Sequence, residues 1–422
     1  MRFTPSQFKH AEALLTELLR FSTPADAVIS YYYQKHRQLG QRDRAFIAEI
    51  LYTVLRHLRS LTVCCGEKQS ARHLLLAVLA RIYGVNPQAQ GVIIHESEHE
   101  WLARVKEVSL KEGDHAVYLD LPDWLYEKLL KQFSLDELGL LAKALNQQAT
   151  LDLRVNSLKA ERGVVLAHLQ QEGMRVQICP YSPWGVRVFE NPSLKKHPLF
   201  LDGSLEVQDE GSQLLGLLLQ PRRGERVADF CAGTGGKTLL FGALMRSTGR
   251  IYAFDVEEKR LLKMKMRLTR SGLSNVHPVY IDSENDIKVK RLAGKLDRVF
   301  IDAPCTGTGT LRRHPDLKWR QDEKSMADFP SRQLRILEAA STLVKKGGRL
   351  VYATCSLLEE ENFTVVSNFL TEHPEFVKLN AVEILSKQGI LIDGDIRNDG
   401  CLHLLPHRHN TDGFFAAVLE RQ

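Results

Sequence analysis

The sequence lacks the cysteine spacing of a disulfide framework or a structural zinc site. Its seven cysteines are an odd number, and no two of them form a CxxC pair. We therefore expect individual thiols in a reducing compartment and no bound metal. The longest purely apolar run, near residues 214–219, is far short of the ~18–20 residues that span a bilayer. The first residues carry no secretory signal, so we expect a soluble, cytoplasmic protein without a membrane partner.

Internal repeats and low-complexity segments are also missing, and glycine and proline do not cluster enough to mark a long flexible linker. The length of 422 residues suggests several domains, because one domain usually has ~150 residues. A hydrophobic content of 44% and a charged content of 26% are typical of a globular protein. The net charge of +6 permits a polyanionic partner without requiring one.

The sequence pattern divides the chain into three parts. Residues 1–147 repeat leucine and isoleucine at helical spacing, which predicts an all-α domain. Residues 148–204 combine alternating runs with one helical stretch, which indicates a small α+β module. Residues 205–422 alternate apolar runs with helical stretches, which predicts an α/β domain with a mostly parallel sheet covered by helices on both faces. Its expected strands are Arg226–Phe230, Arg250–Phe254, Val276–Tyr280, Arg298–Ile301 and Arg349–Ala353.

Four arginines lie on or beside an apolar helical stripe in the first part. They are Arg42, Arg44, Arg56 and Arg59. One interpretation is a solvated basic face on a bundle helix, and the other is a surface that follows RNA phosphates. The sequence alone does not choose between the two.

A glycine-rich loop follows the first strand of the α/β domain and precedes an apolar helix. It has the sequence Asp229-Phe-Cys-Ala-Gly-Thr-Gly-Gly-Lys-Thr238. Such glycines let backbone amides approach a ligand at a helix N-terminus. The loop ends like a phosphate loop, but Cys231 replaces the first glycine of that motif. The alternative is the nucleoside loop of an S-adenosylmethionine (SAM) methyltransferase, with Cys231, Ala232, Gly233, Thr234, Gly235, Gly236 and Lys237.

Acidic residues at the ends of the next two strands favour the nucleoside loop. Asp255 lies 26 residues beyond Asp229, and Asp282 follows the third strand. In dinucleotide-type α/β sites an acid ~20 residues past the glycine loop accepts hydrogen bonds from ribose hydroxyls. Successive carboxylates suit a ribose and an adenine amine, whereas they would repel a triphosphate. We therefore expect SAM as the cofactor.

Two cysteines follow the fourth and fifth strands. Cys305 lies in Asp302-Ala-Pro-Cys-Thr-Gly-Thr-Gly309, and Cys355 lies in Ala353-Thr-Cys-Ser356. One cysteine in a sheet is usually a small buried hydrophobic residue, but two thiols at adjacent strand ends are harder to explain by packing. A thiolate is a strong nucleophile. Beside a methyl donor, the pair predicts attack on an electron-poor ring.

These motifs resemble those of the Sun/Fmu (NOP2/Sun) family of RNA cytosine-5 methyltransferases. The resemblance extends to Leu311-Arg-Arg-His-Pro-Asp-Leu-Lys-Trp319 and to Leu153-Arg-Val-Asn-Ser157. It implies a Rossmann-like class I SAM-dependent methyltransferase domain. The segment Leu39–Phe46 is similar to the NusB-like helical domain of bacterial members. The glycine loop departs from the family's Cys-Ala-Ala-Pro-Gly-Gly-Lys, since Gly233 and Thr234 replace alanine and proline.

The resemblance also implies a mechanism. Cys355 would add to carbon 6 of cytosine, carbon 5 would take the methyl group of SAM, and Cys305 would assist release of the product. Asp302 would hydrogen-bond the ring edge. Spacing alone does not say which cysteine attacks.

The cofactor roles follow from the same resemblance. Asp255 would hold the ribose, Asp282 the adenine end, and residues 231–237 the methionine portion, with Asp302 beside them. For Lys237, capping the loop as a cation is an equally good interpretation.

The partner is expected to be RNA, with a single-stranded or flipped cytidine that can reach two thiols in a cleft. The helical N-terminal domain favours small-subunit (16S) ribosomal RNA, with transfer RNA as the alternative. Two other classes of protein stay open: a phosphate-loop nucleotide hydrolase and a non-catalytic RNA-binding assembly factor. We expect the protein to be a monomer. The candidate RNA contacts are Arg154, Asn156, Arg312, Arg313, His314, Lys318 and Trp319. For Arg154 and Arg313, a structural hydrogen bond to a carboxylate is a strong alternative to an RNA contact.

Overall fold

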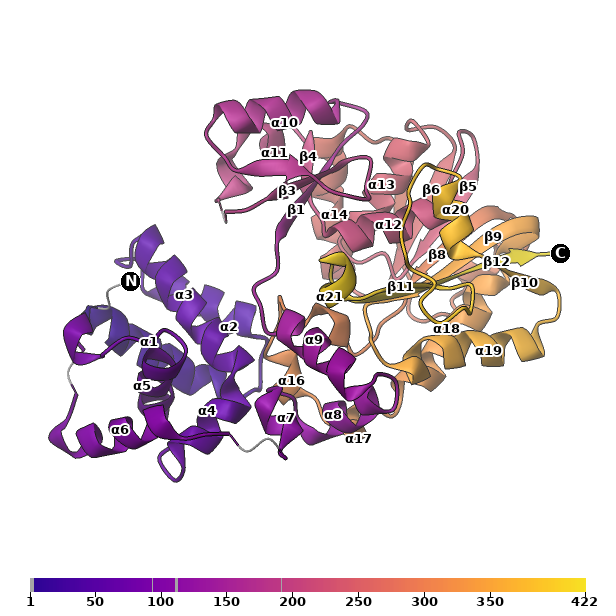
Figure 1. Cartoon of the computed structure of the whole chain (residues 1–422). Coiled ribbons are helices and arrows are strands. Elements are labelled where there is room, and N and C mark those ends of the chain that lie inside the picture. Colours follow the sequence, from indigo (N-terminus) through magenta and orange to yellow (C-terminus); the bar gives the residue numbers. More distant parts are fainter. Residues whose placement is uncertain (1–3, 93, 111–112, 191) are drawn as a thin grey trace. The chain divides into compact units, whose positions relative to one another are not determined.

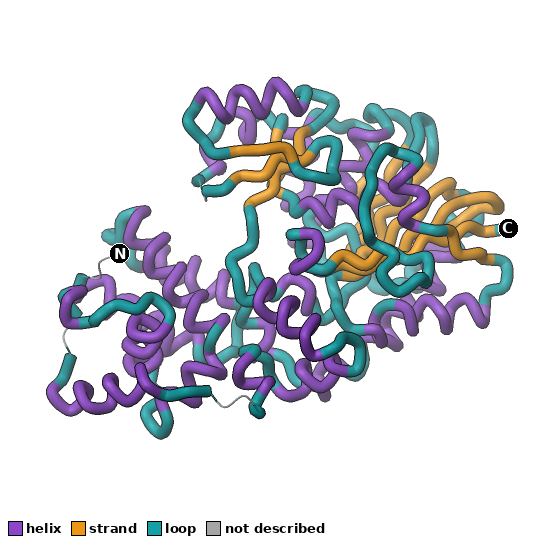
Figure 2. Tube along the Cα trace, viewed as in Figure 1, coloured by secondary structure: helices purple, strands orange, loops and turns teal. Residues whose placement is uncertain are grey.

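The computed structural model describes residues 4–92, 94–110, 113–190 and 192–422, and Figures 1 and 2 show its helices and strands. The chain forms two compact units. The first comprises residues 1–148 and 310–325, and the second comprises residues 149–309 and 326–422. The all-α part predicted for residues 1–147 therefore includes a distant segment. The small module predicted for residues 148–204 groups with the α/β domain.

The first unit is helical because its apolar residues recur on one face of each helix. In α3, Ile47, Ile50, Leu51, Val54 and Leu55 are fully buried and follow helical spacing. None of the described helices is both long and apolar enough to cross a bilayer. The helices are α1 (Pro5–Leu18), α2 (Ala25–Lys35), α3 (Gln41–Arg56), α4 (Leu58–Cys65), α5 (Ala71–Arg81), α6 (His99–Glu107), α7 (His115–Tyr118), α8 (Asp123–Leu130) and α9 (Leu135–Leu145), with short turns η1 (Gln88–Gln90) and η2 (Glu96–Glu98).

Residues 310–325 complete this unit from far along the sequence. The segment contains the short helix α16 (Leu317–Arg320) and most of α17 (Glu323–Met326). The Ala25 N–H donates to Asp316 Oδ2 at 3.1 Å, so the side chain of Asp316 accepts an amide from the first turn of α2. Such a bond satisfies one of the amides that a helix start leaves unpaired.

The second unit begins with a small antiparallel sheet in the order β2-β3-β1-β4. Alternation buries Leu153 and Val155 of β1 against Leu169 of the neighbouring helix. The predicted strand over residues 151–155 is confirmed, and the helix predicted over residues 158–172 is shorter. The elements are β1 (Leu151–Val155), α10 (Arg162–Gln171), β2 (Val176–Ile178), β3 (Gly185–Val188), η3 (Leu194–Lys196), α11 (Pro198–Leu201) and β4 (Leu205–Val207).

The large sheet has the order β10-β12-β9-β8-β5-β6-β7, with β11 paired to β12. Strands β5 to β9 pair in parallel, whereas β12 is antiparallel to both β9 and β10. The predicted mostly parallel sheet is confirmed, and the antiparallel edge is an addition that the sequence did not predict. The strands are β5 (Arg226–Phe230), β6 (Arg250–Asp255), β7 (Val276–Tyr280), β8 (Leu296–Asp302), β9 (Val344–Thr354), β10 (Phe376–Leu379), β11 (Leu402–Leu404) and β12 (Phe414–Arg421).

Both faces of this sheet are buried, which explains its nearly continuous apolar strands. Along β9, Leu350 and Tyr352 face one core together with α18 and α19. Val351 and Ala353 face the opposite core together with α12, α13 and α20. The helices are α12 (Glu210–Leu219), α13 (Gly236–Leu244), α14 (Glu258–Ser271), α15 (Ile287–Lys290), α18 (Phe329–Ser341), α19 (Phe363–Glu372), α20 (Ala381–Ser386) and α21 (Pro406–His409), with turns η4 (Thr308–Thr310) and η5 (Glu359–Glu361).

Candidate active site

The glycine-rich loop joins the carboxyl end of β5 to the N-terminus of α13. Three of its residues have left-handed backbones, with φ of 68° at Cys231, 57° at Gly233 and 86° at Gly235. A Cβ on Gly235 would lie 2.6 Å from Met264 of α14, so glycine is required there. A Cβ on Gly233 would meet nothing within 4 Å. The loop is thus tightly packed below and open at Gly233, next to the unpaired amides of a helix start.

Asp255 at the end of β6 holds this loop. Its carboxylate is buried, and the Gly233 N–H donates to Oδ2 at 2.7 Å. The Glu257 N–H donates to Oδ1 at the same distance. Asp282 follows β7 and is exposed. A hydrogen bond to Asp282 and the charge of its carboxylate raise the pKa of Tyr280.

Asp229 at the end of β5 is fully buried below the loop. Thr238 Oγ1 donates to its Oδ2 at 2.5 Å, whereas Oδ1 has no partner among the described residues. Burial raises the pKa of Asp229 to about 7, against the opposing effect of the Thr238 hydrogen bond. An unpaired buried oxygen is costly, so this atom is suited to accept a hydrogen bond from a bound ligand.

Lys237 reaches Asp302 at the end of β8, with Nζ 2.7 Å from Oδ2. Burial lowers the pKa of Lys237, but the charge and hydrogen bond of Asp302 outweigh it and the net pKa is raised. The charge of Asp229 and the Cys355 thiol act in the same direction. The ammonium therefore lies between the glycine loop and the cysteines, and its partner is a side chain of the predicted site.

Cys305 and Cys355 meet because they follow adjacent parallel strands. In β8 and β9, Asp302 pairs with Ala353, and the two Sγ atoms lie 3.3 Å apart. Both cysteines are partly exposed. The hydrogen bond with Cys355, burial and the charge of Glu361 raise the pKa of Cys305. The structure thus brings the two thiols together at adjacent strand ends, where the sequence predicted them, and it also pairs Lys237 with Asp302.

The predicted RNA contacts Arg154 and Asn156 are corrected by the structure, because both are buried. Arg154 Nη1 donates to Gln208 Oε1 at 2.8 Å and to the Gly236 carbonyl at 2.9 Å. Asn156 Nδ2 donates to the carbonyls of Gly203 and Ser271. Their polar atoms bind protein, so their role in this structure is to join β1 to the glycine loop and to the end of α14.

Lys318 is also corrected, since it is buried inside the helical unit, whereas Trp319 is half-buried. Lys318 is 2% exposed, and Nζ donates to the carbonyls of Arg56 and Asp120 and to Asn146 Oδ1. Trp319 Nε1 donates to the Leu55 carbonyl at 2.7 Å.

The three other candidates in this segment differ in exposure. Arg312 is buried, whereas Arg313 is half-buried. His314 is also half-buried, and its Nδ1 lies 3.5 Å from Asp26 Oδ2. Arg313 and His314, like Trp319, keep part of the exposure that an RNA contact needs. A short basic motif does not reveal which of its side chains turn inward.

The arginine stripe of the first unit is mostly structural. Arg44 Nε donates to the Leu39 carbonyl at 2.9 Å, and Arg56 Nη2 donates to the Arg312 carbonyl at 3.2 Å. Arg59 binds the Leu121 carbonyl and Asp123. Of these four arginines, Arg42 alone has the full exposure that a solvated basic face or a phosphate-binding face requires.

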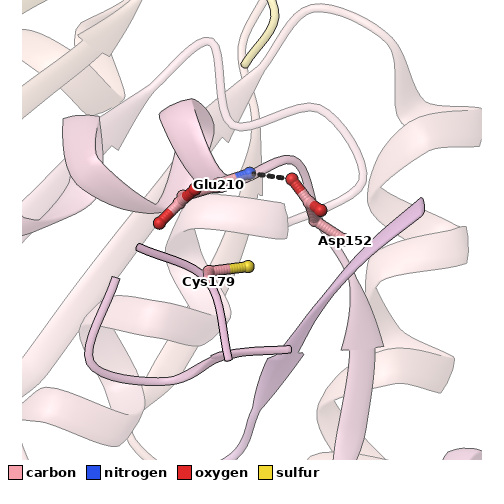
Figure 3. Close-up of side chains that lie close together, drawn as sticks. All are labelled: Asp152, Cys179 and Glu210. Atoms are coloured by element: carbon pink, nitrogen blue, oxygen red, sulfur yellow. Dashed lines mark hydrogen bonds between the residues drawn. The ribbon is translucent and has the colours of Figure 1, made fainter. Parts of the chain in front are cut away.

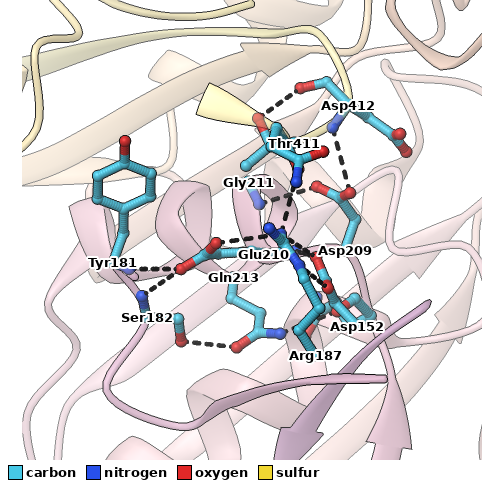
Figure 4. Close-up of polar contacts among 12 residues, drawn as sticks. Asp152, Tyr181, Ser182, Arg187, Asp209, Glu210, Gly211, Gln213, Thr411 and Asp412 are labelled. Atoms are coloured by element: carbon cyan, nitrogen blue, oxygen red, sulfur yellow. Dashed lines mark hydrogen bonds and ion pairs between the residues drawn. The ribbon is translucent and has the colours of Figure 1, made fainter. Parts of the chain in front are cut away.

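The described residues contain one close group of metal-ligand type, namely Asp152, Cys179 and Glu210 (Figure 3). Figure 4 shows Arg187 between the two carboxylates, with Nε 2.7 Å from Asp152 Oδ1 and Nη2 3.3 Å from Glu210 Oε2. The guanidinium already compensates their charge, and burial raises the pKa of Cys179. A protonated thiol is a poor metal ligand, so this group is an ion-pair network that fastens the small sheet.

One feature of the site was not predicted from the sequence, namely the buried carboxylate of Glu361. It lies behind the two cysteine loops and accepts hydrogen bonds from Thr306 and Ser356. The only sequence signal is the acidic run Glu359–Glu361, which by itself resembles a solvated surface turn.

Comparisons with known proteins agree with this architecture. A model described as 16S rRNA methyltransferase RsmB/F matches residues 216–420, and a model of the RsmF/B-like ferredoxin-like domain matches residues 121–194. The probable ribosomal RNA small subunit methyltransferase B of Synechocystis sp. is 30% identical over 97% of this chain and 98% of its own.

Two solved structures from Pyrococcus horikoshii share the fold. A methyltransferase homolog protein is 29% identical, with a TM-score of 0.62 over 74% of this chain and all of its own. NSun6, solved with SFG, is 24% identical, with a TM-score of 0.63 over 71% of this chain and 98% of its own.

The strand order, the antiparallel β12 beside β9 and the glycine loop after β5 define a Rossmann-like methyltransferase. More particularly, the chain belongs to the RsmB/F (Sun/Fmu) family of 16S rRNA methyltransferases. The resemblance found in the sequence is confirmed, and so is the α/β fold with a helical N-terminal region consistent with a NusB-like domain.

Proposed function

We propose that this protein transfers the methyl group of SAM to carbon 5 of a cytidine in 16S ribosomal RNA through a covalent cysteine adduct. The observation that carries the proposal is the pair of sulfurs 3.3 Å apart at adjoining strand ends. A ribosomal RNA substrate is supported by the names of the family and of the Synechocystis relative. The reaction would take place in the cytoplasm, where such RNA is made in bacteria.

The residues around the glycine loop fit SAM, whose methyl group is activated by a sulfonium centre. The open side of Gly233 leaves room for the ligand beside the backbone. Asp229 Oδ1, buried without a partner among the described residues, would accept from the methionine ammonium. Asp255 would accept from the ribose with its remaining lone pairs. Asp282, at the exposed end of β7, would bind the adenine side.

The protein's own groups would then carry the base through four changes. Cys355 Sγ bonds to carbon 6, and the electron pair of the 5,6 double bond moves toward carbon 5 and the ring. Asp302 would hydrogen-bond the ring edge, and the Lys237 ammonium, 2.7 Å from Asp302 Oδ2, would offset the negative charge that develops on the ring. Carbon 5 takes the methyl group as the sulfur–methyl bond of SAM breaks, and carbon 5 then loses its proton to a base. Its electrons restore the double bond as the carbon–sulfur bond breaks, and Cys305 assists this release.

Replacement of Cys355 and replacement of Cys305 are predicted to block different steps of the reaction. Cys355→Ala should abolish transfer and form no adduct, because carbon 6 is never attacked. Cys305→Ala should still methylate the base but release it slowly, so a protein–RNA adduct should survive denaturing electrophoresis. Methyl transfer to 16S RNA fragments from labelled SAM, followed by nucleoside analysis, measures both steps. Calorimetric titration with SAM controls for intact folding, and an adduct in Cys355→Ala alone would reverse the two roles.

A further inference from the structure

The carboxylate of Glu361 is buried directly behind the cysteine pair. Glu361 ends the turn η5 and is 1% exposed. Oε1 accepts from Thr306 Oγ1 at 2.5 Å and from Ser356 Oγ at 2.6 Å. Oε2 accepts from the Thr306 N–H and from Gln333 Nε2, both at 2.9 Å. All four donors are neutral, so the carboxylate is held by hydrogen bonds rather than by an ion pair.

These donors flank both cysteines. Thr306 directly follows Cys305, and Ser356 directly follows Cys355. Gln333 Nε2 also donates to the carbonyl of Pro304, the residue before Cys305. One carboxylate is therefore tied to the loop of each thiol, and on the Cys305 side it is tied to both neighbours of the cysteine.

The next residue fastens the second loop from the other side. Asn362 Nδ2 donates to the Ser356 carbonyl at 2.9 Å, and its Oδ1 accepts from Thr354 Oγ1 at 2.5 Å. Tyr352 Oη donates to the Glu361 carbonyl at 2.7 Å. Positions on both sides of Cys355 are thus bound to the dipeptide Glu361–Asn362.

We propose that Glu361 is a positioning residue that fixes the loops of Cys305 and Cys355 so that their sulfurs stand side by side. Its consequence for catalysis rests on the proposed covalent mechanism, but its effect on the thiols does not. Reacting groups lose rate steeply when they are misplaced by as little as 1 Å. A buried charge also acts on the thiol directly, because the negative Glu361 raises the pKa of Cys305 together with Cys355 and burial.

Glu361→Gln isolates this role because it keeps the size of the side chain. The new NH2 group would face either Gln333 Nε2, donor against donor, or the hydroxyls of Thr306 and Ser356, which would then have to turn and accept. Either orientation changes hydrogen bonds that tie this side chain to the cysteine loops. We expect kcat to fall about 100-fold, with KM for RNA and the SAM dissociation constant within about twofold of the wild type. Glu359→Gln is the matched control, since Glu359 lies on the same turn and pairs with Arg397. It should keep full activity.

A thiol measurement tests the proposal without RNA. The titratable groups that act on Cys305 are Cys355 and Glu361, and Cys305 in turn acts on Tyr352. In a Cys355→Ala background, the rate of Cys305 alkylation by iodoacetamide is followed against pH by peptide mass spectrometry. Adding Glu361→Gln should move the midpoint to lower pH, because a negative charge that opposes the thiolate is removed.

The outcomes separate this proposal from the proposed function. A shifted alkylation profile without any 5-methylcytosine activity in the wild type would support the positioning role and contradict the reaction. If Glu361→Gln left both the alkylation profile and kcat unchanged, the positioning role would be overturned. It would also be overturned if the loss of activity in Glu361→Gln came with a matching loss of SAM affinity and a lower melting temperature. If Glu361→Gln fails to fold, Thr306→Val replaces it, because that change removes one hydroxyl donor. Thr306→Ser should restore activity, and failure of this rescue would also overturn the proposal.

Discussion

At the residue scale, single carboxylates shape the backbone that a cofactor would meet. Asp255 accepts two backbone amides at 2.7 Å, one from Gly233 in the glycine loop and one from Glu257 after β6. Hydrogen bonds to a charged group are stronger than those between neutral groups. The same side chain therefore fixes the loop and would bind the ribose.

Asp255→Ala should consequently weaken SAM binding by about 1–3 kcal/mol, the range expected for lost hydrogen bonds to a charged acceptor. Calorimetric titration with SAM measures the change. Glu257→Ala is the control, because the Glu257 side chain is half exposed, pairs with Arg260 and contributes only its backbone amide to Asp255. SAM affinity equal to the wild type in Asp255→Ala would contradict this role.

The sequence predicted which strand ends meet better than it predicted the surroundings of the basic residues. Asp302, Cys305 and Cys355 follow strands whose apolar runs are easy to recognise, so their meeting at one sheet edge follows from topology. Arg154 and Lys318 have no such signal, since a cation in a short motif can face solvent or an internal carbonyl. Only the packed structure decides between these two orientations.

At the element scale, the segment Leu311–Trp319 shows how a motif can serve folding. Lys318 Nζ has three oxygen acceptors inside the helical unit, one for each hydrogen of an ammonium group. Burial nevertheless lowers the pKa of Lys318 to about 7, and the charge of Asp120 opposes the shift only in part. The anchoring of the segment is therefore sensitive to pH.

This shift predicts the pH dependence of stability. Between about pH 7 and the usual lysine pKa of 10.5, the unfolded chain binds more protons at Lys318 than the folded chain. The free energy of unfolding should therefore rise with pH in this window, by at most about 1.4 kcal/mol per pH unit. Urea unfolding at several pH values measures it.

Lys318→Met serves as the reference for this measurement. It should flatten the rise and lower stability near neutral pH, because three buried oxygens lose their donor. An equal slope in the two proteins would show that other groups cause the pH dependence.

The strands β9, β10 and β11 of the large sheet show what residue patterns along the sequence fail to predict. Strand β9 begins at Val344 and runs through Lys345, Lys346 and two glycines before its apolar part. That polar start hid the first residues of the strand, so only residues 349–353 were predicted. Strands β10 and β11 are short and lie in or near a region without a recognised motif, and their pairing with β12 depends on distant partners.

At the scale of the whole molecule, the helical unit is discontinuous in sequence. The predicted boundary at residue 147 is one residue from the observed end of the first segment, but the unit also includes residues 310–325. Periodicity reveals local elements and not their distant partners. This is why the sequence assigned that segment to the catalytic domain.

A chain of residues 149–422 alone should therefore leave residues 310–325 without their partners. Brief trypsin digestion should cut this truncated chain at Arg312, Arg313 or Lys318, whereas the full chain should resist there because Arg312 and Lys318 are buried. Mass spectrometry of the fragments identifies the cuts. Equal resistance in both chains would mean that the segment is ordered without the helical unit.

The discontinuity also determines when the parts of the helical unit become available during synthesis. Helices α1 to α9 are made first, but the residues that satisfy the Arg56 and Asp120 carbonyls emerge only with Lys318, about 170 residues after the last of these helices. At 5–20 residues per second, a ribosome needs roughly 10–35 s to cover that distance. During this interval the helical unit is incomplete, because α16 has not yet been synthesised and cannot pack against it. The nascent chain thus depends on a late segment to complete its earliest part, while the second unit still lacks residues 326–422.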